Sequence, residues 1–235
     1  MLASTGAARF PTKYGSERPS SRLSRVDRDV AEKLLSNLCG VETLEEIQRL
    51  RYDVYCNECG FLDSNNFPDE REQDEYDAVS VHCAATDATG KLTGTVRLVR
   101  DSGLGFPLEA HARRLDPAFY ALPRERTAEI SRLVVAKSSR GYLGELRPDP
   151  GVLFALLREM NRESAKLGLT NWIAAMEPTL IRLLRRLLRI DMLLIGEPMD
   201  YYGEVLPYLV PIADVGRRFQ RTRPDLFSYF GFDLY

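Results

Sequence analysis

Two apolar β-type runs of the sequence carry charged side chains in their interiors. Glu129 and Arg132 lie in EISRLVVAK, and Arg97 lies in LTGTVRLVR. A charge within an apolar strand needs a partner or a chemical task, because burying it alone is costly. A reaction that moves a proton needs an acceptor, and a carboxylate within an apolar strand can serve as one. Glu129 is therefore the candidate base, and the alternative is a structural carboxylate paired with Arg132.

The spacing of Glu129 and Arg132 sets a geometric condition. Successive side chains of a strand alternate between its two faces, so residues three apart point to opposite sides. Both side chains can line one site only if a β-bulge lies between them. Arg97, in the preceding strand, can pair with the carboxylate of an acceptor or with acidic residues from earlier in the chain.

A second set of candidates precedes the strands. Arg51 and Tyr55 are four residues apart in LRYDVYCNECGFL, Phe61 follows six residues later, and Asp74 and Asp77 end an acid-rich segment. An arginine and two carboxylates can share bidentate hydrogen bonds, either around an acceptor or as a clasp that fixes the loop. Tyr55 and Phe61 are candidates for substrate contact, although such aromatics are more often plain core residues.

The residue pattern predicts one domain, over residues 26–235, that positions these side chains. Apolar residues recur at helical spacing over 26–55, and residues 62–77 form a polar loop. Strands are predicted at 78–85, 92–100, 129–137, 170–176, 192–198 and 205–215, and helices near 108–115, over 152–168 and over 179–190. This order predicts an α/β (α+β) fold, a mixed central sheet with helices on both faces. Residues 1–25 lack periodicity and are expected to form a flexible arm.

The composition excludes several classes of protein. The chain has 235 residues, 44% of them hydrophobic, with 32 basic against 34 acidic side chains, so no overall field attracts nucleic acid. Its start lacks the apolar segment of a secretory signal, and no stretch approaches the ~18 apolar residues of a membrane span. We therefore expect a cytoplasmic protein without stable membrane insertion, whose membrane contact is at most peripheral and made through a lipid.

Cysteine and histidine residues give no sign of a metal site. Cys56 and Cys59 form a CxxC pair, but a zinc site needs a second pair of ligands at short spacing. The two histidines, His82 and His111, are isolated from each other and from the cysteines. We expect packing cysteines, no bound metal and two non-catalytic histidines.

Taken in order, these motifs resemble the acyl-homoserine lactone (autoinducer) synthases of the GNAT superfamily, over about residues 47–140. The matching pattern is Arg-x-x-x-aromatic with a second aromatic, an acidic pair, a strand arginine, and Glu-x-x-Arg. The strings RYDVYCNECGFLD, FPDEREQDEYDAVSVH, GTVRLVR, EISRLVV and DYYGEVLPYLVP look more specifically like bacterial long-chain N-acyl amino acid synthases and the acyltransferases of the PEP-CTERM/exosortase system.

This resemblance implies a GNAT/autoinducer-synthase-like fold and an N-acyltransferase that moves a fatty acyl group to the α-amino group of an amino acid. It implies catalytic roles for Glu129 and Arg132, and a splay in the sheet that lets both face one site. By the same resemblance, the substrate-binding residues are Arg51, Tyr55, Phe61, Asp74, Asp77 and Arg97.

The expected donor is acyl carrier protein, with no further cofactor. A GNAT enzyme that uses CoA follows its central strand with a glycine-rich loop that holds pyrophosphate. Here Arg140–Glu145 places the glycines at other offsets and adds a carboxylate. Two alternatives remain open: an acyl-homoserine lactone synthase that uses S-adenosylmethionine, and a non-catalytic GNAT-like module that binds an acylated partner. Phe61 stands where lactone synthases usually have tryptophan.

The segment TLIRLLRRLLRI predicts a docking surface for the carrier protein. Its arginines recur at positions i, i+3, i+4 and i+7, so they share one stripe of a helix, whose remaining surface is leucine. Carrier proteins are small acidic domains, which a cationic stripe attracts. A solvated helix face is an equally good interpretation. The stripe consists of Arg182, Arg185, Arg186 and Arg189.

Overall fold

The computed structural model describes residues 43–87, 89–139 and 151–234 of the chain. A single sheet of seven strands organises these residues, in the order β1-β2-β3-β4-β7-β5, with β6 paired to β7. The strands are β1 (Ser80–Thr86), β2 (Leu92–Arg100), β3 (Thr127–Val135), β4 (Asn171–Met176), β5 (Leu193–Leu194), β6 (Met199–Asp200) and β7 (Glu204–Pro211). Only β3 and β4 are parallel, so the sheet is mixed, as predicted.

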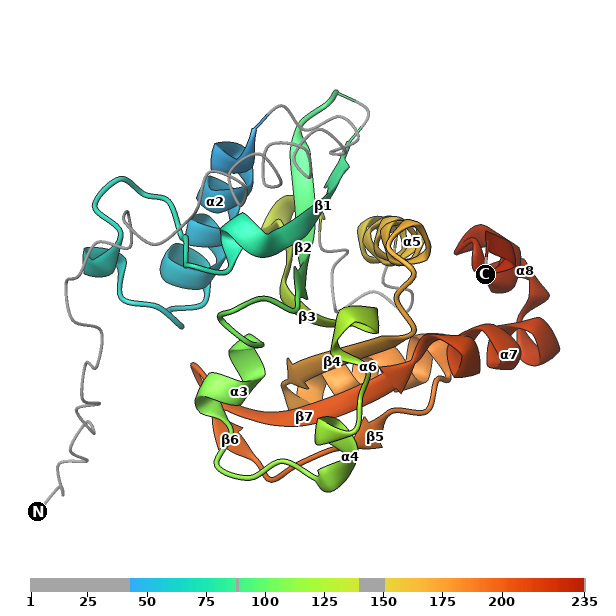
Figure 1. The fold of residues 1–235 in the computed structure, drawn as a ribbon. Helices are drawn as coiled ribbons and strands as arrows, with labels where there is room; N and C mark the ends of the chain where they lie inside the picture. Colours follow the sequence, from blue (N-terminus) through green and yellow to red (C-terminus); the bar gives the residue numbers. More distant parts are fainter. Residues whose placement is uncertain (1–42, 88, 140–150, 235) are drawn as a thin grey trace, which may run out of the picture.

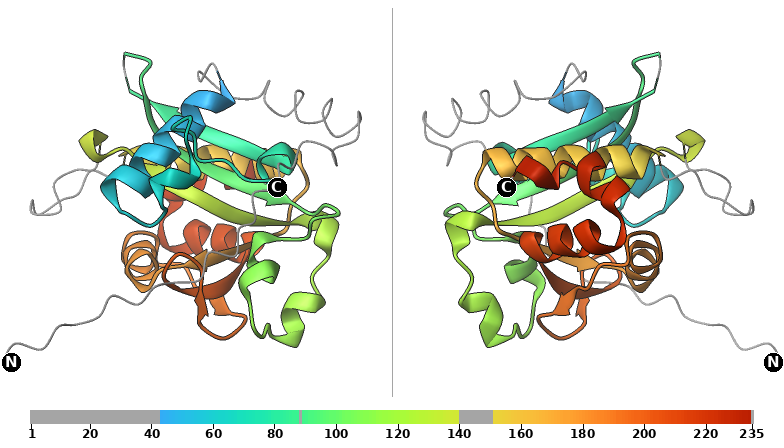
Figure 2. Two further views of the ribbon diagram at one scale, coloured as in Figure 1. Left: turned by 90° about the vertical axis from the view of Figure 1, so that its left-hand side faces the viewer. Right: turned by 90° about the vertical axis from the view of Figure 1, so that its right-hand side faces the viewer.

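Helices cover both faces of this sheet (Figures 1 and 2). On β2, Val96 and Leu98 pack into the larger core with α5, whereas Arg97 points to the opposite face, toward α2. Beyond the middle of the sheet, α6 and α7 share the larger core, and α3 and α4 enclose a second, smaller core. The helices are α2 (Leu44–Tyr52), α3 (Pro107–His111), α4 (Pro117–Tyr120), α5 (Gly151–Lys166), α6 (Pro178–Leu188), α7 (Ile212–Thr222) and α8 (Pro224–Tyr229).

The helix that carries Arg51 has clear start and stop signals. Thr43 caps α2, accepting a hydrogen bond from the Glu46 amide at 3.3 Å, and acidic residues occupy the first turn. After Tyr52 the chain continues as a π-helical turn over Asp53–Glu58. Such turns widen a helix and re-aim its side chains, and they often mark functional sites. Here the turn carries Tyr55.

Three sequence predictions are wrong in their boundaries. The run 205–215 was expected to be a strand, but β7 ends at Pro211 and α7 begins at Ile212. Ile212, Val215 and Phe219 follow helical spacing and bury one face of α7, so the helical period takes over where the strand pattern was extrapolated. The run 192–198 contributes only two paired residues of β5, and the helix expected over 108–115 is α3, which ends at His111 and is followed by the separate α4.

The central feature of the sheet is a split between β3 and β4. The two strands pair only where Thr127–Glu129 meets Asn171–Ile173. Beyond this point β3 stays with β2, and β4 stays with β7. Side chains from both strands then face a shared space, so the sheet has the splay that the resemblance implied. The predicted arm at 1–25, the helical pattern before residue 40 and the stretch Arg140–Glu145 lie outside the described residues.

Candidate active site

A β-bulge brings Glu129 and Arg132 to the same site. Between Thr95 and Arg97 the β2–β3 register shifts, because β3 contains one residue more than β2 over this stretch. Arg132 lies at this point with a φ of 52°, in the left-handed region that is strained for a residue with a side chain. The bulge cancels the strand alternation, and Glu129 and Arg132 line one cavity. The condition that the sequence imposed on this pair is met.

Glu129 is a buried carboxyl group that contacts no cationic side chain among the described residues. Its side chain is 1% exposed, and Oε2 accepts a hydrogen bond from the Leu108 amide at 2.8 Å. Burial raises the pKa of Glu129 to about 8, because desolvation outweighs the hydrogen bond and the attraction of Arg97 and Arg132. A structural ion pair between Glu129 and Arg132 is therefore absent among the described contacts. A carboxyl group with such a pKa exchanges a proton near neutral pH.

Next to Glu129 lies a compact set of buried ionic groups, which we call the charge cluster. Three arginines and three carboxylates compose it: Arg51, Arg97, Arg132, Glu72, Asp74 and Asp77. Burial of such groups is tolerable only when each charge is paired and hydrogen-bonded. Their six formal charges cancel, so the cluster as a whole is neutral.

Arg51 and Arg97 anchor the acid-rich loop to the sheet. Arg51, fully buried on α2, donates from Nη1 to Asp77 at 2.8 Å and from Nη2 to the Glu72 carbonyl at 2.9 Å. Arg97 donates to both oxygens of Asp74, at 2.6 and 3.0 Å, and also to Asp77. Of the two partners that the sequence left open for Arg97, the structure gives the cluster acids.

Arg132 links the charge cluster to the cavity. Its Nε donates to Glu72 at 3.0 Å, Nη2 donates to Asp74 at 3.0 Å, and Nη1 donates to the Tyr201 hydroxyl at 3.3 Å. The guanidinium carbon also lies 5.8 Å from the centre of the Tyr55 ring. An arginine held on three sides presents its remaining N–H groups in a fixed direction, which suits a group that must stabilise developing charge.

The charge cluster favours the ionised forms of its two aspartates and three arginines. Arg97 and Arg132 lower the pKa of Asp74 against the opposing effect of burial, and Arg51 and Arg97 do the same for Asp77. The carboxylates in turn raise the pKa of the three arginines. His82, buried beneath Asp77, has its pKa lowered to about 4 by desolvation, so it is neutral.

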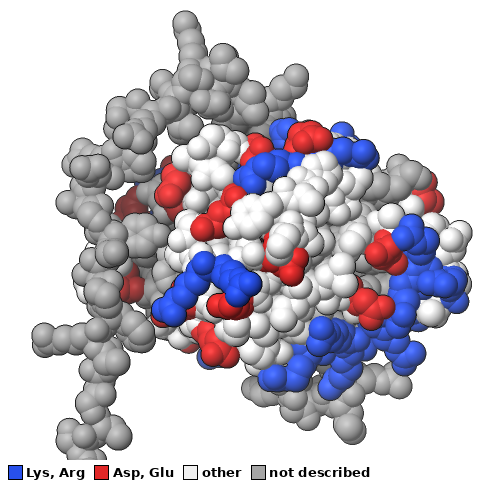
Figure 3. All heavy atoms as spheres, turned by 60° about the horizontal axis from the view of Figure 1, so that its bottom comes forward, with Lys and Arg blue, Asp and Glu red and all other residues white. Residues whose placement is uncertain are grey.

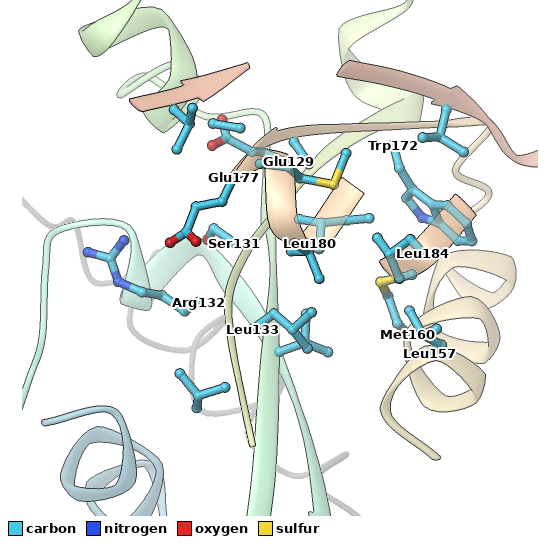
Figure 4. Close-up of a pocket in the computed structure, with 18 of the residues that line it drawn as sticks. Glu129, Ser131, Arg132, Leu133, Leu157, Met160, Trp172, Glu177, Leu180 and Leu184 are labelled. Carbon is cyan, nitrogen blue, oxygen red and sulfur yellow. The ribbon is translucent and has the colours of Figure 1, made fainter. Parts of the chain in front are cut away.

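The cavity between β3 and β4 is large and mostly apolar. Its volume is about 410 Å³, which exceeds the ~150 Å³ of an engineered core cavity that holds benzene. Figure 4 shows Arg132 and Glu177 on one side of it, Leu133 and Leu180 between, and an apolar group on the far side. That group comprises Leu157, Met160, Trp172 and Leu184. A long apolar ligand fits this space, with its polar end beside Glu129 and Arg132.

Aromatic side chains surround the polar end of the cavity. Tyr55 and Phe61 line it together, with ring centres 6.4 Å apart. Phe61 is 43% exposed, so its interpretation as a plain core residue is wrong. Tyr201 lines the cavity as well, and His111 stacks on it with ring centres at 3.8 Å. His111 is therefore not isolated, although it does not line the cavity itself.

Four residues of this site were missed in the sequence. Glu72 forms ion pairs with both Arg51 and Arg132. The hydroxyl groups of Ser131 and Tyr201 accept hydrogen bonds, from Arg97 at 3.0 Å and from Arg132 respectively. Glu177 adds an exposed carboxylate to the rim of the cavity. Glu72 and Tyr201 lie within the strings that carry the family resemblance, so position in those strings was the available signal. Glu177 carried no signal beyond its place before Pro178.

The arginines predicted as a docking stripe are on the surface. Arg182, Arg185 and Arg186 are exposed on α6, but Arg189 lies beyond the helix, as its C-cap with a φ of 52°. The helix stops at Leu188, so the stripe is one residue shorter than predicted. A small hollow of about 180 Å³ lies between the segment after α6, at Ile190 and Asp191, and Arg217, Arg218 and Arg221 of α7. Figure 3 shows basic side chains gathered along the lower right border of this side of the molecule.

The described part of the chain has neither a cluster of metal-ligating side chains nor a helix that could span a membrane. Within residues 43–87, 89–139 and 151–234, no group of three or more His, Cys, Asp or Glu side chains has the arrangement of a metal site. In the same part of the chain, no helix combines the length and apolar character needed to cross a membrane.

The geometry can support nucleophilic acyl transfer. The cavity has room for an apolar chain, Glu129 can take a proton at its polar end, and Arg132 can donate hydrogen bonds to an oxygen that gains charge. The neutral charge cluster fixes Arg132 without adding net charge to the site.

Comparisons with known proteins agree with this geometry. Residues 50–146 match the family model described as acetyltransferase (GNAT) domain. Three similar solved structures are the CoA-dependent acyl-homoserine lactone synthase BjaI, with SAM and isopentyl-CoA (TM-score 0.56, 19% identity, 90% of this chain and 87% of that chain); TofI, with an inhibitor and MTA (0.55, 21%, 77% and 91%); and the CoA-dependent acyl-homoserine lactone synthase MesI (0.54, 21%, 89% and 91%).

No curated protein matches the chain in sequence. At these identities the solved structures establish the fold, and the family model establishes the domain over the residues it matches. Residues 50–146 thus match a GNAT acetyltransferase domain, and the chain has the fold of the autoinducer synthases.

Proposed function

We propose that the protein transfers a fatty acyl group from a carrier thioester to the α-amino group of an amino acid. The observation that carries the proposal is the apolar cavity of about 410 Å³ that opens beside a buried carboxyl group whose pKa is raised to about 8. An acyltransferase needs this combination of a dry chamber for the chain and a proton acceptor at its reactive end.

The reaction that fits the site forms one C–N bond and breaks one C–S bond. The amine attacks the thioester carbonyl beside Glu129, and the Glu129 carboxylate takes a proton from the nitrogen. Arg132 donates hydrogen bonds to the carbonyl oxygen while it carries negative charge. The thiolate then leaves, and the proton held by Glu129 neutralises it, so the enzyme returns to its starting state.

Acyl carrier protein is the donor that we propose, and the α6 arginines form its docking surface together with Arg189. Positive side chains on one exposed helix attract an acidic partner and raise its rate of association. Arg217, Arg218 and Arg221 of α7 line a hollow together with Ile190 and Asp191, which follow Arg189 directly in the chain. BjaI and MesI are described as CoA-dependent, so acyl-CoA is the donor to compare.

One observation favours a second function, that of an acyl-homoserine lactone synthase with S-adenosylmethionine as acceptor. The three arginines of the charge cluster are balanced by its three carboxylates, and Glu177 adds an exposed negative charge at the rim. Among the described residues, a cationic acceptor is therefore better matched than one with a free carboxylate. The structure of BjaI contains SAM.

Mass spectrometry of the reaction products separates these functions. The purified protein would be incubated with acyl carrier protein or CoA bearing a labelled acyl chain, together with the amino acids and S-adenosylmethionine. A labelled N-acyl amino acid is the expected product. An acyl lactone would establish the second function instead. Absence of any labelled amide from both donors, with the acyl chain bound, would identify a non-catalytic acyl-binding module.

A further inference from the structure

The far end of the cavity is built by the C-terminal part of the chain. Four residues after β7 line it: Val215 and Phe219 of α7, Phe230 at the end of α8, and Phe232 in the turn that follows. These residues come after the last strand of the sheet and lie far from Glu129 in the chain. They therefore close the chamber independently of the residues that would perform the chemistry.

The three phenylalanines form one packed unit. Phe219 lies 5.6 Å from Phe230 and 5.6 Å from Phe232, measured between ring centres. Phe232 also packs on Gly216, where a Cβ atom would come within 3.1 Å of its ring. The Asn161 side-chain amide of α5 donates to the Phe230 carbonyl at 2.9 Å and ties the unit to the body of the protein. The end wall is thus fixed from two sides.

The length of the chamber follows from the helix that runs along it. Glu177, Leu180, Leu184 and Leu188 all line the cavity, at consecutive turns of α6. At ~1.5 Å per residue, the stretch from Glu177 to Leu188 spans about 16 Å. An extended hydrocarbon advances ~1.3 Å per carbon, given C–C bonds of ~1.5 Å. The lined stretch therefore accommodates about 12 carbons.

The volume of the cavity leads to a similar length. A methylene group is comparable in size to a water molecule, whose share of liquid volume is ~30 Å³. The cavity of about 410 Å³ therefore holds on the order of 14 such groups. Length and volume are separate properties of the cavity, and they agree.

We propose that the phenylalanine wall of Phe219, Phe230 and Phe232 limits the acyl chain to about 12–14 carbons, which makes these residues determinants of donor specificity. The proposal rests on the proposed acyl transfer for its biological meaning, but the limit itself is a property of the cavity. Chains shorter than the limit leave the far end empty, and longer chains must displace the wall.

Trp172 provides a direct measurement of this limit. It is the single tryptophan of the chain, and it lines the cavity on the side away from Arg132. Unlabelled fatty acids from C6 to C18 would be titrated against the intact protein, with Trp172 fluorescence and calorimetry as parallel signals. Affinity should rise about fourfold per added methylene, as burial of a CH₂ group predicts, and should stop rising at C12–C14.

Two variants move the wall in opposite directions. Val215→Phe fills the far end and should lower the limit by two to four carbons, whereas Phe232→Leu should raise it by about two. Phe227→Leu is the matched control, since Phe227 packs in the same C-terminal segment without lining the cavity. Thermal unfolding identifies any variant that does not fold, and the chain-length series on the wild type stands without the variants.

The outcomes separate this proposal from the proposed function. A limit at C12–C14 that shifts with Val215→Phe but not with Phe227→Leu supports the phenylalanine wall, even if no acyl transfer is found. Affinity that continues to rise through C18, or a limit at C8 or below, overturns it, even if the protein is an active acyltransferase. Equal shifts for Phe227→Leu and Phe232→Leu would assign the effect to general loosening and also overturn it.

Discussion

The two ends of the cavity are built on opposite principles. At the polar end, Arg51, Arg97 and Arg132 are each held by two or more carboxylate oxygens. At the apolar end, Trp172 and the phenylalanines enclose space that their own side chains leave unfilled. At the polar end the ion pairs fix the positions of the side chains, whereas at the apolar end volume remains free for a ligand. The difference indicates that geometry matters at one end and capacity at the other.

β3 runs between the two ends of the cavity and contributes side chains to both. Its first residues pair with both neighbours and hold Glu129 at the point where the sheet divides. The bulge at Arg132 then turns a second side chain toward the charge cluster. Beyond the bulge, Leu133, Val134 and Val135 line the cavity. One strand thus carries the proton acceptor, the hydrogen-bond donor and part of the acyl chamber.

The largest effect is expected from removal of the proton acceptor at the polar end. Glu129→Gln keeps the shape and the acceptor of the Leu108 amide, but it cannot take a proton. We expect kcat to fall about 10²–10⁴-fold, with acyl-chain binding at the apolar end unchanged. The control is Glu125→Gln, which changes an exposed glutamate four residues earlier in the chain. Loss of chain binding in Glu129→Gln would show that the two ends are not independent.

The same substitution, which lowers activity, should make the folded protein more stable than the wild type near pH 8. The folded-state pKa of Glu129 is about 8, above the ~4.3 of an unfolded glutamate, so the unfolded state releases its proton first as pH rises. Wild-type stability therefore falls between about pH 4.5 and pH 8, by on the order of 3–5 kcal/mol from this group. Glu129→Gln should lack this fall. Urea unfolding at pH 5 and pH 8 measures it, and parallel curves for both proteins would refute the raised pKa.

Removal of one arginine from the charge cluster should chiefly lower the free energy of unfolding. Arg97→Met leaves Asp74 and Asp77 buried with less compensation, and we expect a loss of about 3–5 kcal/mol in the free energy of unfolding. The matched control is Arg124→Met, which removes a more exposed arginine that also pairs with two carboxylates. That change should cost about 1 kcal/mol or less. Equal losses in urea denaturation would mean that burial of the cluster is not what matters.

Substitution of the exposed arginines on α6 should have a smaller effect than substitution of the buried Arg97, and the effect should be on donor binding. Arg182→Glu combined with Arg186→Glu is expected to raise the KM for acyl carrier protein about tenfold at low salt, with kcat little changed and a weaker dependence on ionic strength. Arg217→Glu with Arg221→Glu tests the neighbouring part of the surface on α7. If only the α7 pair raises KM, the carrier protein docks there and not on α6.

The smallest effect is expected at the link between Tyr201 and Arg132. Tyr201→Phe removes one hydrogen bond of 3.3 Å and leaves the two carboxylate contacts of Arg132 in place. A neutral hydrogen bond contributes about 0.5–1.5 kcal/mol, so kcat/KM should fall about two- to tenfold. Tyr120→Phe, on an exposed ring, is the control. A loss above a hundredfold would assign Tyr201 a direct part in the reaction.

The sequence was informative where a residue type conflicts with its surroundings. Arg97 in an apolar strand had to be paired, and its partners proved to be Asp74 and Asp77, both already selected. Glu72 was missed because it lies among many acids of the same loop, where composition cannot distinguish a buried carboxylate from a solvated one. The bulge was a condition that alternation imposed and that only the family resemblance favoured, since a left-handed φ at an arginine has no sequence signal.

The apolar end was the least predictable part of the site. Leucine, valine and phenylalanine are core residues throughout the chain, and a pattern of spacing cannot tell which of them face empty space. The run after β7 illustrates the same limit: its apolar residues fit a strand and a helix, and α7 was missed. The wall of Phe219, Phe230 and Phe232 depends on this helix, so it could not be inferred without coordinates.

The pH dependence of kcat/KM tests the central claim most directly, namely that Glu129 accepts the proton in acyl transfer. Measured from pH 5.5 to 9.5 with one donor and one amine, and calculated on the concentration of the neutral amine, the wild-type value should rise about tenfold per pH unit and level off near pH 8, where Glu129 is ionised. The residual activity of Glu129→Gln should show no such rise. A wild-type profile that is flat above pH 6, or an unchanged rise in Glu129→Gln, would contradict the assignment of Glu129 as the base.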